Sequence, residues 1–448
     1  MAKFQPILTR NYGVPNSRSL AVYRERGGYQ ALAKALEMGR EAVAAEVKKA
    51  ELRGRGGAGF PAGVKWGFLP PDREVTYLCV NSDEAEPPTF KDRTLIENDP
   101  HQLIEGILIT GYATQTTVAY VYMRAEFHKQ FHILQKALDE AYKADLIGRK
   151  IMGSDFAMDV YIHRGAGAYV CGEETGLIES IEGKRGWPRI KPPFPAVAGL
   201  FGKPTVINNV ETVCCVNHIV LEGADWFCSI GPEGSKGPKL FAVSGPVQRP
   251  GVYEAAMDIT VRDLIYGEDF AQGMVEGEEL QGVLPGGISM GILRADELDC
   301  KLDFEDVRKY GLLGLGTGAA VVVPARTDIR TVLLNLARFY AHESCGQCTQ
   351  CREGTGWMAK IAQRIADGAG RIEDLDLLID ISKNMGMMPG LNICGLSDGA
   401  GWPIRSVVEK FRSELEAKIK AQPAGAADRA LAEINPAYYA GAGKVRAE

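Results

Sequence analysis

The chain has 448 residues with a net charge of −6, and 46% of them are hydrophobic, which allows two or three domains of ordinary globular composition. It has no Lys- or Arg-rich run of the kind that binds nucleic acid, no apolar run near the ~18 residues of a membrane helix, and no signal or transit pattern at its N-terminus. A cytoplasmic protein is expected, and ten cysteines are too few for a secreted disulfide scaffold.

The first motif along the chain is a glycine-rich loop, Gly54-Arg55-Gly56-Gly57-Ala58-Gly59-Phe60-Pro61. It contains the G-x-G-x-x-G pattern, but the preceding segment 44–52 has a helical pattern and Pro61 interrupts the segment after the loop. The ordinary dinucleotide-binding strand–loop–helix unit is therefore not predicted. Bare glycine backbone still lets a flat ring or a phosphate approach its amide groups closely. A flexible surface loop is the alternative, and the nearby Phe60 and Trp66 disfavour it.

Residues 75–163 alternate between strand and helix patterns. Strands are predicted at 75–80, 118–123 and 159–163, with helices at 100–113 and 127–142 between them. This alternation predicts an α/β fold with right-handed crossovers and a parallel sheet, whose ligands bind at the carboxyl ends of the strands.

Polar segments lie at or near that edge. Asn81-Ser82-Asp83-Glu84-Ala85-Glu86-Pro87 carries three carboxylates, which accept hydrogen bonds from ribose or ribityl hydroxyls; a solvated acidic loop is the alternative. The segment 165–175 adds glycines, an aromatic residue and the acids Glu173-Glu174. Lys191-Pro-Pro-Phe194-Pro195 is a rigid stretch suited to holding Phe194 against a flat base. The amides of Asn208-Asn209 can bond the edge of a heterocycle.

Two further regions come next along the chain. Strands at 239–245, 251–254, 280–284 and 319–323 around a small helix at 261–265 predict a compact α+β module of the ubiquitin-like kind. Helical patterns at 331–340, 357–365, 375–381 and 403–419 predict a four-helix bundle, with Pro403 near the first turn of its last helix. The chain after Gln422 is rich in Ala, Gly and Pro and is expected to be irregular.

The most specific motif lies between the first two of these helices. Ser344-Cys345-Gly-Gln-Cys348-Thr-Gln-Cys351 places three thiols on one tight loop, which suits three corners of an iron–sulfur cubane, and Cys394 can supply the fourth. Tetrahedral zinc is the alternative, but structural zinc usually takes two pairs of cysteines rather than three plus one. The other six are expected to pack in the core: Cys79, Cys171, Cys214, Cys215, Cys228 and Cys300.

In their order along the chain, these motifs resemble those of the flavin subunit of respiratory complex I, NADH:ubiquinone oxidoreductase. The resembling segments are 54–61, 81–93, 165–175, 191–196, 208–212 and 345–351, and the resemblance runs from about residue 8 to about residue 419. It implies a Rossmann-like FMN- and NADH-binding domain at 1–238, a ubiquitin-like domain at 239–328, and a helical bundle with a 4Fe–4S cluster at 329–421, before the tail at 422–448.

The resemblance also assigns ligands, motif by motif. FMN contacts are expected from Gly54, Arg55, Gly56, Gly57, Lys65, Asn81, Asp83, Glu84, Tyr169, Gly172, Glu173, Asn208 and Asn209. Contacts to NAD(H) are expected from Gly59, Phe60, Phe68, Glu86, Glu174, Lys191 and Phe194. The cluster ligands are expected to be Cys345, Cys348, Cys351 and Cys394. No catalytic side chain is expected, because the flavin itself accepts the hydride.

The implied activity is hydride transfer from NADH to FMN, followed by one-electron transfer through the cluster toward quinone. The implied partners are a thioredoxin-like 2Fe–2S subunit and a larger multi-cluster iron–sulfur subunit, which would hold the chain at the cytoplasmic face of a bacterial inner membrane. One alternative is the diaphorase subunit of an NAD-linked hydrogenase or formate dehydrogenase, which often carries fused iron–sulfur domains. No cysteine precedes Cys79 or follows Cys394 to ligate such clusters. The other is a non-catalytic metal-binding scaffold.

Three positions depart from the usual pattern of the family. Glu86-Pro87-Pro88-Thr89 stands where Glu-Pro-Gly-Thr is common, so the backbone near Glu86 loses an N–H group. Gln350 stands where proline is usual, and the loop 395–399 also differs. The surroundings of the cluster, and with them its potential, are therefore expected to differ in detail.

Overall fold

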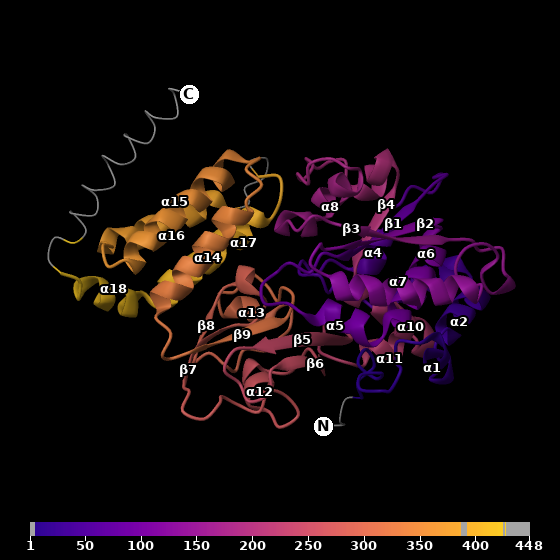
Figure 1. Ribbon diagram of the computed structural model, residues 1–448, viewed down its shortest axis with the longest axis horizontal. Coiled ribbons are helices and arrows are strands. Elements are labelled where there is room, and N and C mark those ends of the chain that lie inside the picture. Colours follow the sequence, from indigo (N-terminus) through magenta and orange to yellow (C-terminus); the bar gives the residue numbers. More distant parts are fainter. Residues whose placement is uncertain (1–4, 387–391, 424–425, 427–448) are drawn as a thin grey trace.

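The structure is a computed structural model that describes residues 5–386, 392–423 and 426, so that the predicted irregular tail lies almost wholly outside the described residues. The polypeptide forms three regions (Figure 1). The first contains a parallel sheet with helices, the second a smaller mixed sheet, and the third a group of helices. This arrangement confirms the predicted α/β fold with a helical C-terminal region.

Within the described residues, the first sheet has four parallel strands in the order β3-β2-β1-β4. The strands are β1 (Tyr77–Ser82), β2 (Val118–Met123), β3 (Asp159–Arg164) and β4 (Thr205–Asn209). The longer helices of this region are α2 (Gln30–Met38), α3 (Arg40–Lys49), α5 (Lys91–Asn98), α6 (Pro100–Thr114), α7 (His128–Lys143), α8 (Glu174–Ile181) and α10 (Val210–Glu222). The shorter ones are α1 (Leu20–Glu25), α4 (Ala62–Trp66), α9 (Pro195–Ala198) and α11 (Ala224–Cys228). Strand β4 was not predicted; it brings Asn208 and Asn209 beside the end of β1.

Alternate side chains of β1 enter two different cores, as the pleat of a strand requires. Leu78 and Val80 pack in one core with apolar residues of α6 and α10. Cys79 packs in the other core with Leu177 and Ile178 of α8. The sheet is therefore covered on both faces, which leaves the carboxyl ends of its strands as the place where polar loops gather.

The second region is a five-stranded sheet, within the described residues, in the order β6-β5-β9-β7-β8. Its elements are β5 (Pro238–Ser244), β6 (Gly251–Ala256), α12 (Val261–Tyr266), β7 (Leu280–Leu284), β8 (Leu293–Arg294), α13 (Asp306–Lys309) and β9 (Ala319–Pro324). Its first and last strands lie parallel at the centre and the other pairs are antiparallel, which is the strand order of a ubiquitin-like fold. The short strand β8 carries too little apolar pattern to be predicted.

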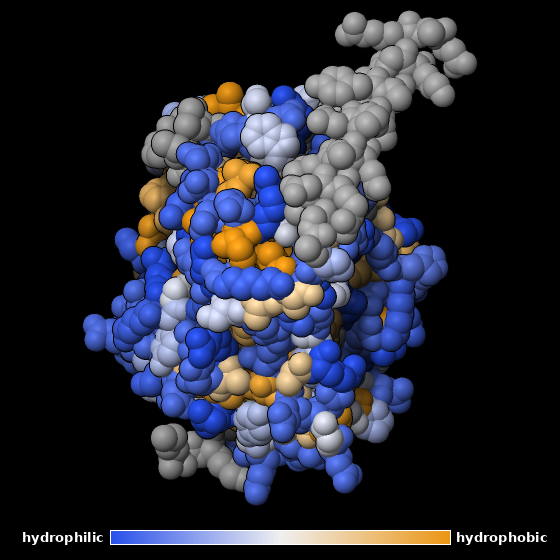
Figure 2. Space-filling model, turned by 90° about the vertical axis from the view of Figure 1, so that its left-hand side faces the viewer, coloured by the Kyte–Doolittle hydropathy of each residue, from blue (hydrophilic) through white to orange (hydrophobic). Residues whose placement is uncertain are grey.

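The third region contains α14 (Ile329–Glu343), α15 (Thr349–Ala366), α16 (Ile372–Met385), α17 (Leu396–Lys410) and α18 (Arg412–Lys420). The prediction of one last helix at 403–419 was wrong. Helix α17 begins earlier and holds Pro403 in its interior, and Phe411 separates it from α18. The predicted domain boundaries, which stay a prediction, fall at the starts of β5 and α14. The face formed by this end of the molecule is largely hydrophilic with small separate apolar areas (Figure 2).

Candidate functional site

A cavity of about 520 Å³ opens at the carboxyl ends of β1 and β4, and all three regions contribute to its wall. Many residues predicted to contact FMN line it: Gly56, Gly57, Asn81, Asp83, Glu84, Tyr169, Gly172, Glu173 and Asn209. Glu86, predicted to contact NADH, lines it as well. The structure therefore brings together residues from four segments that lie far apart in the sequence.

Asp83 lines this cavity and carries a buried acceptor. Among the residues that the structure describes, no donor reaches its Oδ2 atom, which is buried. Burial raises the pKa of Asp83 to about 7, although the nearby Arg124 guanidinium lowers it in part. A buried acceptor without a donor is costly, and a hydroxyl of a bound ribityl chain would supply one. The chemistry of this position fits a flavin.

Two other predicted FMN residues hold the wall itself. Glu84 accepts hydrogen bonds from the backbone N–H groups of Asp92 (2.7 Å) and Arg93 (3.2 Å), which lie in the first turn of α5 and have no partner within the helix. Asn81 donates from Nδ2 to the carbonyl of Gly172 (2.8 Å) and accepts at Oδ1 from the N–H group of Asp83 (3.0 Å). These bonds fix the acidic loop against the segment that follows β3.

Glu86 joins the first region to the second across the cavity. Its Oε2 atom accepts from the Tyr169 hydroxyl (2.6 Å), and its Oε1 atom accepts from the N–H (2.8 Å) and hydroxyl (2.7 Å) of Ser289. Burial raises the pKa of Glu86, and these donors lower it. Next to it, the carbonyl of Pro87 accepts from the Ile288 N–H group (3.1 Å). The departure at Pro88 thus leaves the loop anchored to the second region.

The glycine loop closes on itself and presents its middle to the cavity. Gly54 donates its N–H to the carbonyl of Phe60 (2.9 Å) at the base of the loop. Gly57, at φ +137°, lines the cavity and has open space where a side chain would stand. A Cβ atom at Gly56 would lie 3.0 Å from that of Asn209. The structure does not bring the Arg55 side chain to the cavity, because it is fully buried and donates to the Lys236 carbonyl (2.7 Å).

Beside the cavity, Glu174 forms a charged cluster with two lysines. The Lys65 Nζ atom lies 3.3 Å from Glu174 Oε2, and the Lys191 Nζ atom lies 2.7 Å from Glu174 Oε1. Although burial raises it, the two ammonium groups hold the pKa of Glu174 below its ordinary value. Its neighbour Glu173 caps α8 by accepting from the N–H groups of Thr175 (2.7 Å) and Gly176 (2.9 Å). Glu174 is therefore free of the capping role.

Three predicted NADH residues are exposed aromatic side chains: Phe60, Phe68 and Phe194. The Phe60 and Phe68 rings lie 6.0 Å apart between centroids. Gly59, by contrast, packs against the second region, because a Cβ there would lie 2.5 Å from the Phe304 ring. Asn208 is turned inward and accepts from the Trp66 indole N–H (3.0 Å). Neither Gly59 nor Asn208 lines the cavity.

Several residues that line the cavity were missed by sequence reasoning: Arg53, Thr89, Lys91, Asp92, Ser289, Met290, Phe304, Arg308 and Thr317. Lys91 is fully buried, and its Nζ atom lies 2.8 Å from carboxylate oxygens of both Asp92 and Glu211. Its place within the 81–93 motif was the available signal. The sequence offers no comparable signal for the residues that the second region contributes to the wall, because their position depends on how the two sheets pack together.

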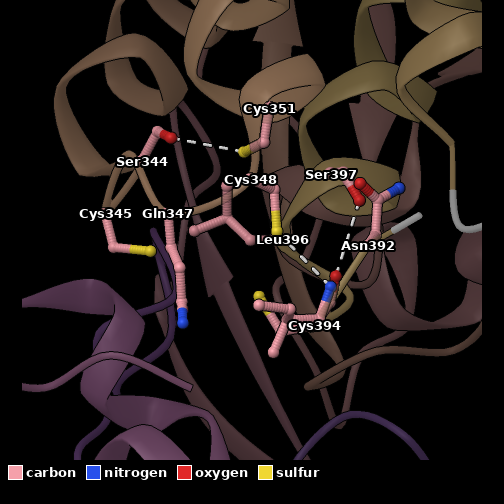
Figure 3. Close-up of a pocket in the computed structure, with 10 residues that line it drawn as sticks. Ser344, Cys345, Gln347, Cys348, Cys351, Asn392, Cys394, Leu396 and Ser397 are labelled. Carbon is pink, nitrogen blue, oxygen red and sulfur yellow. Dashed lines mark hydrogen bonds between the residues drawn. The ribbon is translucent and has the colours of Figure 1, made fainter. Parts of the chain in front are cut away.

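The predicted cluster ligands Cys345, Cys348, Cys351 and Cys394 line one pocket near the starts of α15 and α17. Their sulfur atoms surround a common space (Figure 3). Cys348 is the residue before α15 and Cys351 lies in its first turn, so the start of this helix sets the spacing of two thiols. No three His, Cys, Asp or Glu side chains of the described residues are grouped to hold a single metal ion. Four thiols around one space fit a cubane, each iron of which needs its own thiolate.

Two of these sulfur atoms have hydrogen-bond contacts, and burial raises the pKa of two of the thiols. The Ser344 hydroxyl lies 3.2 Å from the sulfur of Cys351, and the Ile393 N–H group donates to the sulfur of Cys348 (3.4 Å). Burial raises the pKa of Cys394 to about 12 and also raises that of Cys351. Thiolates at these positions would therefore require positive charge beside them, which the irons of a bound cluster would supply. Of the other cysteines, Cys228 is partly exposed and the rest are buried.

The thiol pocket and the cavity share a wall. Cys394 and Leu396 line both of them, so a cluster held by the four thiols would lie next to a ligand in the cavity. A parallel-sheet cavity with a buried acceptor and a glycine wall, beside four converging thiols, defines an oxidoreductase of the iron–sulfur flavoprotein class.

Known families match the same two parts of the chain. The family model described as the Nuo51 FMN-binding domain matches residues 47–218, and that described as the NADH-ubiquinone oxidoreductase-F iron-sulfur binding region matches residues 331–418. The chain belongs to the NADH-quinone oxidoreductase F family, the flavin subunits of complex I.

Named relatives are similar over nearly the whole chain. The F 2 subunit of the NADH-quinone oxidoreductase of Rhizobium meliloti (strain 1021) is 46% identical, over 93% of this chain and 98% of its own. NADH dehydrogenase (ubiquinone) flavoprotein 1, mitochondrial, of Dictyostelium discoideum is 46% identical, over 88% and 82%. Among solved structures, the NAD+-reducing NiFe-hydrogenase in the air-oxidized state is similar with a TM-score of 0.79 and 36% identity, over 93% of this chain and 67% of that one.

Proposed function

We propose that this chain oxidises NADH at a bound FMN and passes single electrons to a 4Fe–4S cluster held by Cys345, Cys348, Cys351 and Cys394. The observation that carries the proposal is the shared wall: Cys394 and Leu396 border both the polar cavity and the thiol pocket. When bound, a flavin accepts a hydride and releases electrons one at a time, which is the conversion needed between NADH and an iron–sulfur cluster.

The cavity residues would bind and orient the flavin. The free Oδ2 atom of Asp83 accepts a hydrogen bond from a ribityl hydroxyl, and the open backbone at Gly57 lets a flat ring or a phosphate come close. Glu84, Asn81 and Asn209 act mainly through the loops that they hold, since their polar atoms already have partners. The proposed role of Arg55 is likewise structural, beneath the loop.

The residues beside the cavity would hold NADH. The exposed rings of Phe60, Phe68 and Phe194 offer faces for the adenine. Glu174, fixed between Lys65 and Lys191, accepts a hydrogen bond from a ribose hydroxyl and repels a 2′-phosphate. No side-chain acid or base takes part in the hydride transfer. The task of the protein is to place donor and acceptor at about 3–3.5 Å.

We further propose that a thioredoxin-like 2Fe–2S subunit and a multi-cluster iron–sulfur subunit receive the electrons and carry them toward quinone. Among the helices of the described residues, none combines the length and apolar character that crossing a membrane requires. Attachment at the cytoplasmic face of a membrane would therefore come through these partners. The likeness to the NAD+-reducing hydrogenase favours a second candidate, a diaphorase subunit, which differs in the partners recovered with the chain.

The test begins with the flavin of the purified protein. Acid-released flavin is identified by chromatography, and the absorbance of the bound flavin is followed as NADH is added without oxygen. We expect the released flavin to be FMN, and we expect the absorbance of the bound flavin to bleach when NADH is added. Recovery of FAD as the main species would refute the FMN assignment, and zinc without flavin would refute the enzyme in favour of a metal-binding scaffold. Partners recovered by pull-down separate complex I from a hydrogenase or formate dehydrogenase.

A further inference from the structure

A side-chain bridge connects the two segments that carry the cluster ligands. Gln350, in the first turn of α15, donates from Nε2 to the Oδ1 atom of Asn392. The Nδ2 atom of Asn392 donates to the carbonyls of Met385 (2.9 Å) and Gly386 (2.7 Å), at the end of α16. Because its NH₂ group serves two carbonyls, the amide of Asn392 cannot turn without losing them, and Oδ1 must face a donor.

The bridge stands next to ligands on both sides. Gln350 immediately precedes Cys351, and Asn392 lies two residues before Cys394. Three of the four thiols belong to the short segment 345–351, in which the start of α15 fixes the spacing of Cys348 and Cys351. Cys394 comes from a separate segment before α17. A second tie, the Ile393 N–H group to the sulfur of Cys348 (3.4 Å), crosses at the same place. The position of the fourth thiol therefore depends on contacts between segments.

We propose that Gln350 and Asn392 are positioning residues that hold Cys394 against its corner of the cluster. The inference rests on the proposed ligation by the four cysteines. Residues behind metal ligands orient them, and their loss commonly costs 10–100-fold in metal affinity or activity. In this chain, removing the bridge should favour loss of the iron at a single corner of the cluster, because the bridge restrains only one of the four thiols. A cubane that loses the iron at one corner becomes a three-iron cluster, which has its own EPR signal.

The experiment oxidises the purified holoprotein with ferricyanide and follows the three-iron EPR signal with time. Ferricyanide takes one electron from each 4Fe–4S cluster, and one Fe²⁺ ion then leaves, so that iron and charge balance. Two variants remove the donor: Gln350→Glu keeps the length but sets a carboxylate against Asn392 Oδ1, and Gln350→Leu is neutral and of similar size. The three-iron signal should appear at least about tenfold faster in both.

Gln363→Leu is the matched control. Gln363 lies on the same helix, is also partly buried, and bonds Asp367 (2.7 Å) outside the thiol pocket. In Gln363→Leu the three-iron signal should appear at the same rate as in the wild type. Rates within about twofold of the wild type for the Gln350 variants, or a rise no larger than that of the control, would overturn the proposal. The flavin content of each variant shows whether it has folded. The rates of the two Gln350 variants are interpreted separately, so that one folded variant is enough to test the proposal. A wild-type protein without a four-iron signal would instead refute the ligand assignment itself.

Discussion

The thiol pocket takes three of its four thiols from residues 345–351, whereas the cavity beside it takes its wall from segments between Arg53 and Gly399. The pocket depends on one helix start and one neighbouring loop. The cavity depends on how a parallel sheet, a ubiquitin-like sheet and a helical region pack together. Most residues of a metal site of the first kind fall in a short sequence motif. Most residues of a cofactor site of the second kind are brought together by tertiary contacts.

Removing a thiol should produce the largest effect on either site. In Cys394→Ala, the 4Fe–4S cluster should be lost or left in a three-iron form, because one corner has no thiolate. Iron content and the EPR spectrum of the reduced protein measure this. Cys228→Ala, which changes a partly exposed cysteine outside the pocket, serves as the control. An unaltered four-iron signal in Cys394→Ala would show that the fourth ligand lies elsewhere.

A change beside the cavity should act on coenzyme choice. Glu174→Ala should raise kcat/KM for NADPH relative to NADH, since like charges a few ångströms apart and partly shielded from water cost about 1–4 kcal/mol, or roughly ten- to a thousand-fold. The rates are measured with ferricyanide as acceptor. Glu179→Ala on the same helix, which breaks an ion pair with Arg189, should leave the ratio unchanged. Equal coenzyme ratios in both variants would exclude a selectivity role for Glu174.

The buried acceptor of the cavity should reveal itself through pH. Burial raises the pKa of Asp83 in the folded protein from 3.8 to about 7, so its charge destabilises the fold above pH 7 and the cost fades as pH falls toward 3.8. Flavin-free Asp83→Asn should therefore exceed the wild type in stability by about 2–4 kcal/mol at pH 8 and by less at pH 5. Thermal unfolding at both pH values measures the difference. A difference that does not change with pH would contradict this account.

The smallest effect is expected at the exposed aromatic side chains. Phe68→Ala should raise KM for NADH by about two- to tenfold, which corresponds to the 0.5–1.5 kcal/mol of an aromatic contact, with little loss of stability. Phe201→Ala removes an equally exposed ring that packs on Tyr77, away from the proposed site, and should leave KM unchanged. The same KM shift in both variants would point to a general effect rather than to binding of the adenine.

The sequence predicted the elements whose pattern is strong and missed those that depend on packing. Strand β2 was predicted at its observed bounds, while β4 was missed because Asn208 and Asn209 obscure its apolar pattern. The last helix was misplaced because Pro403 suggested a helix start. For the site, the cysteine spacing led directly to the pocket. Ser289, which bonds Glu86 across the cavity, could not be found from the sequence, because 203 positions separate the two residues.

One anaerobic experiment tests the central claim that the cavity and the thiol pocket form a single electron path. NADH is added to the purified protein while flavin absorbance and the EPR signal of the reduced cluster are recorded together. We expect the flavin to bleach and the four-iron signal then to appear, and we expect Cys394→Ala to keep the bleaching without that signal. Flavin absorbance that NADH leaves unchanged, or a bleached flavin beside an intact cluster that stays oxidised, would contradict the claim.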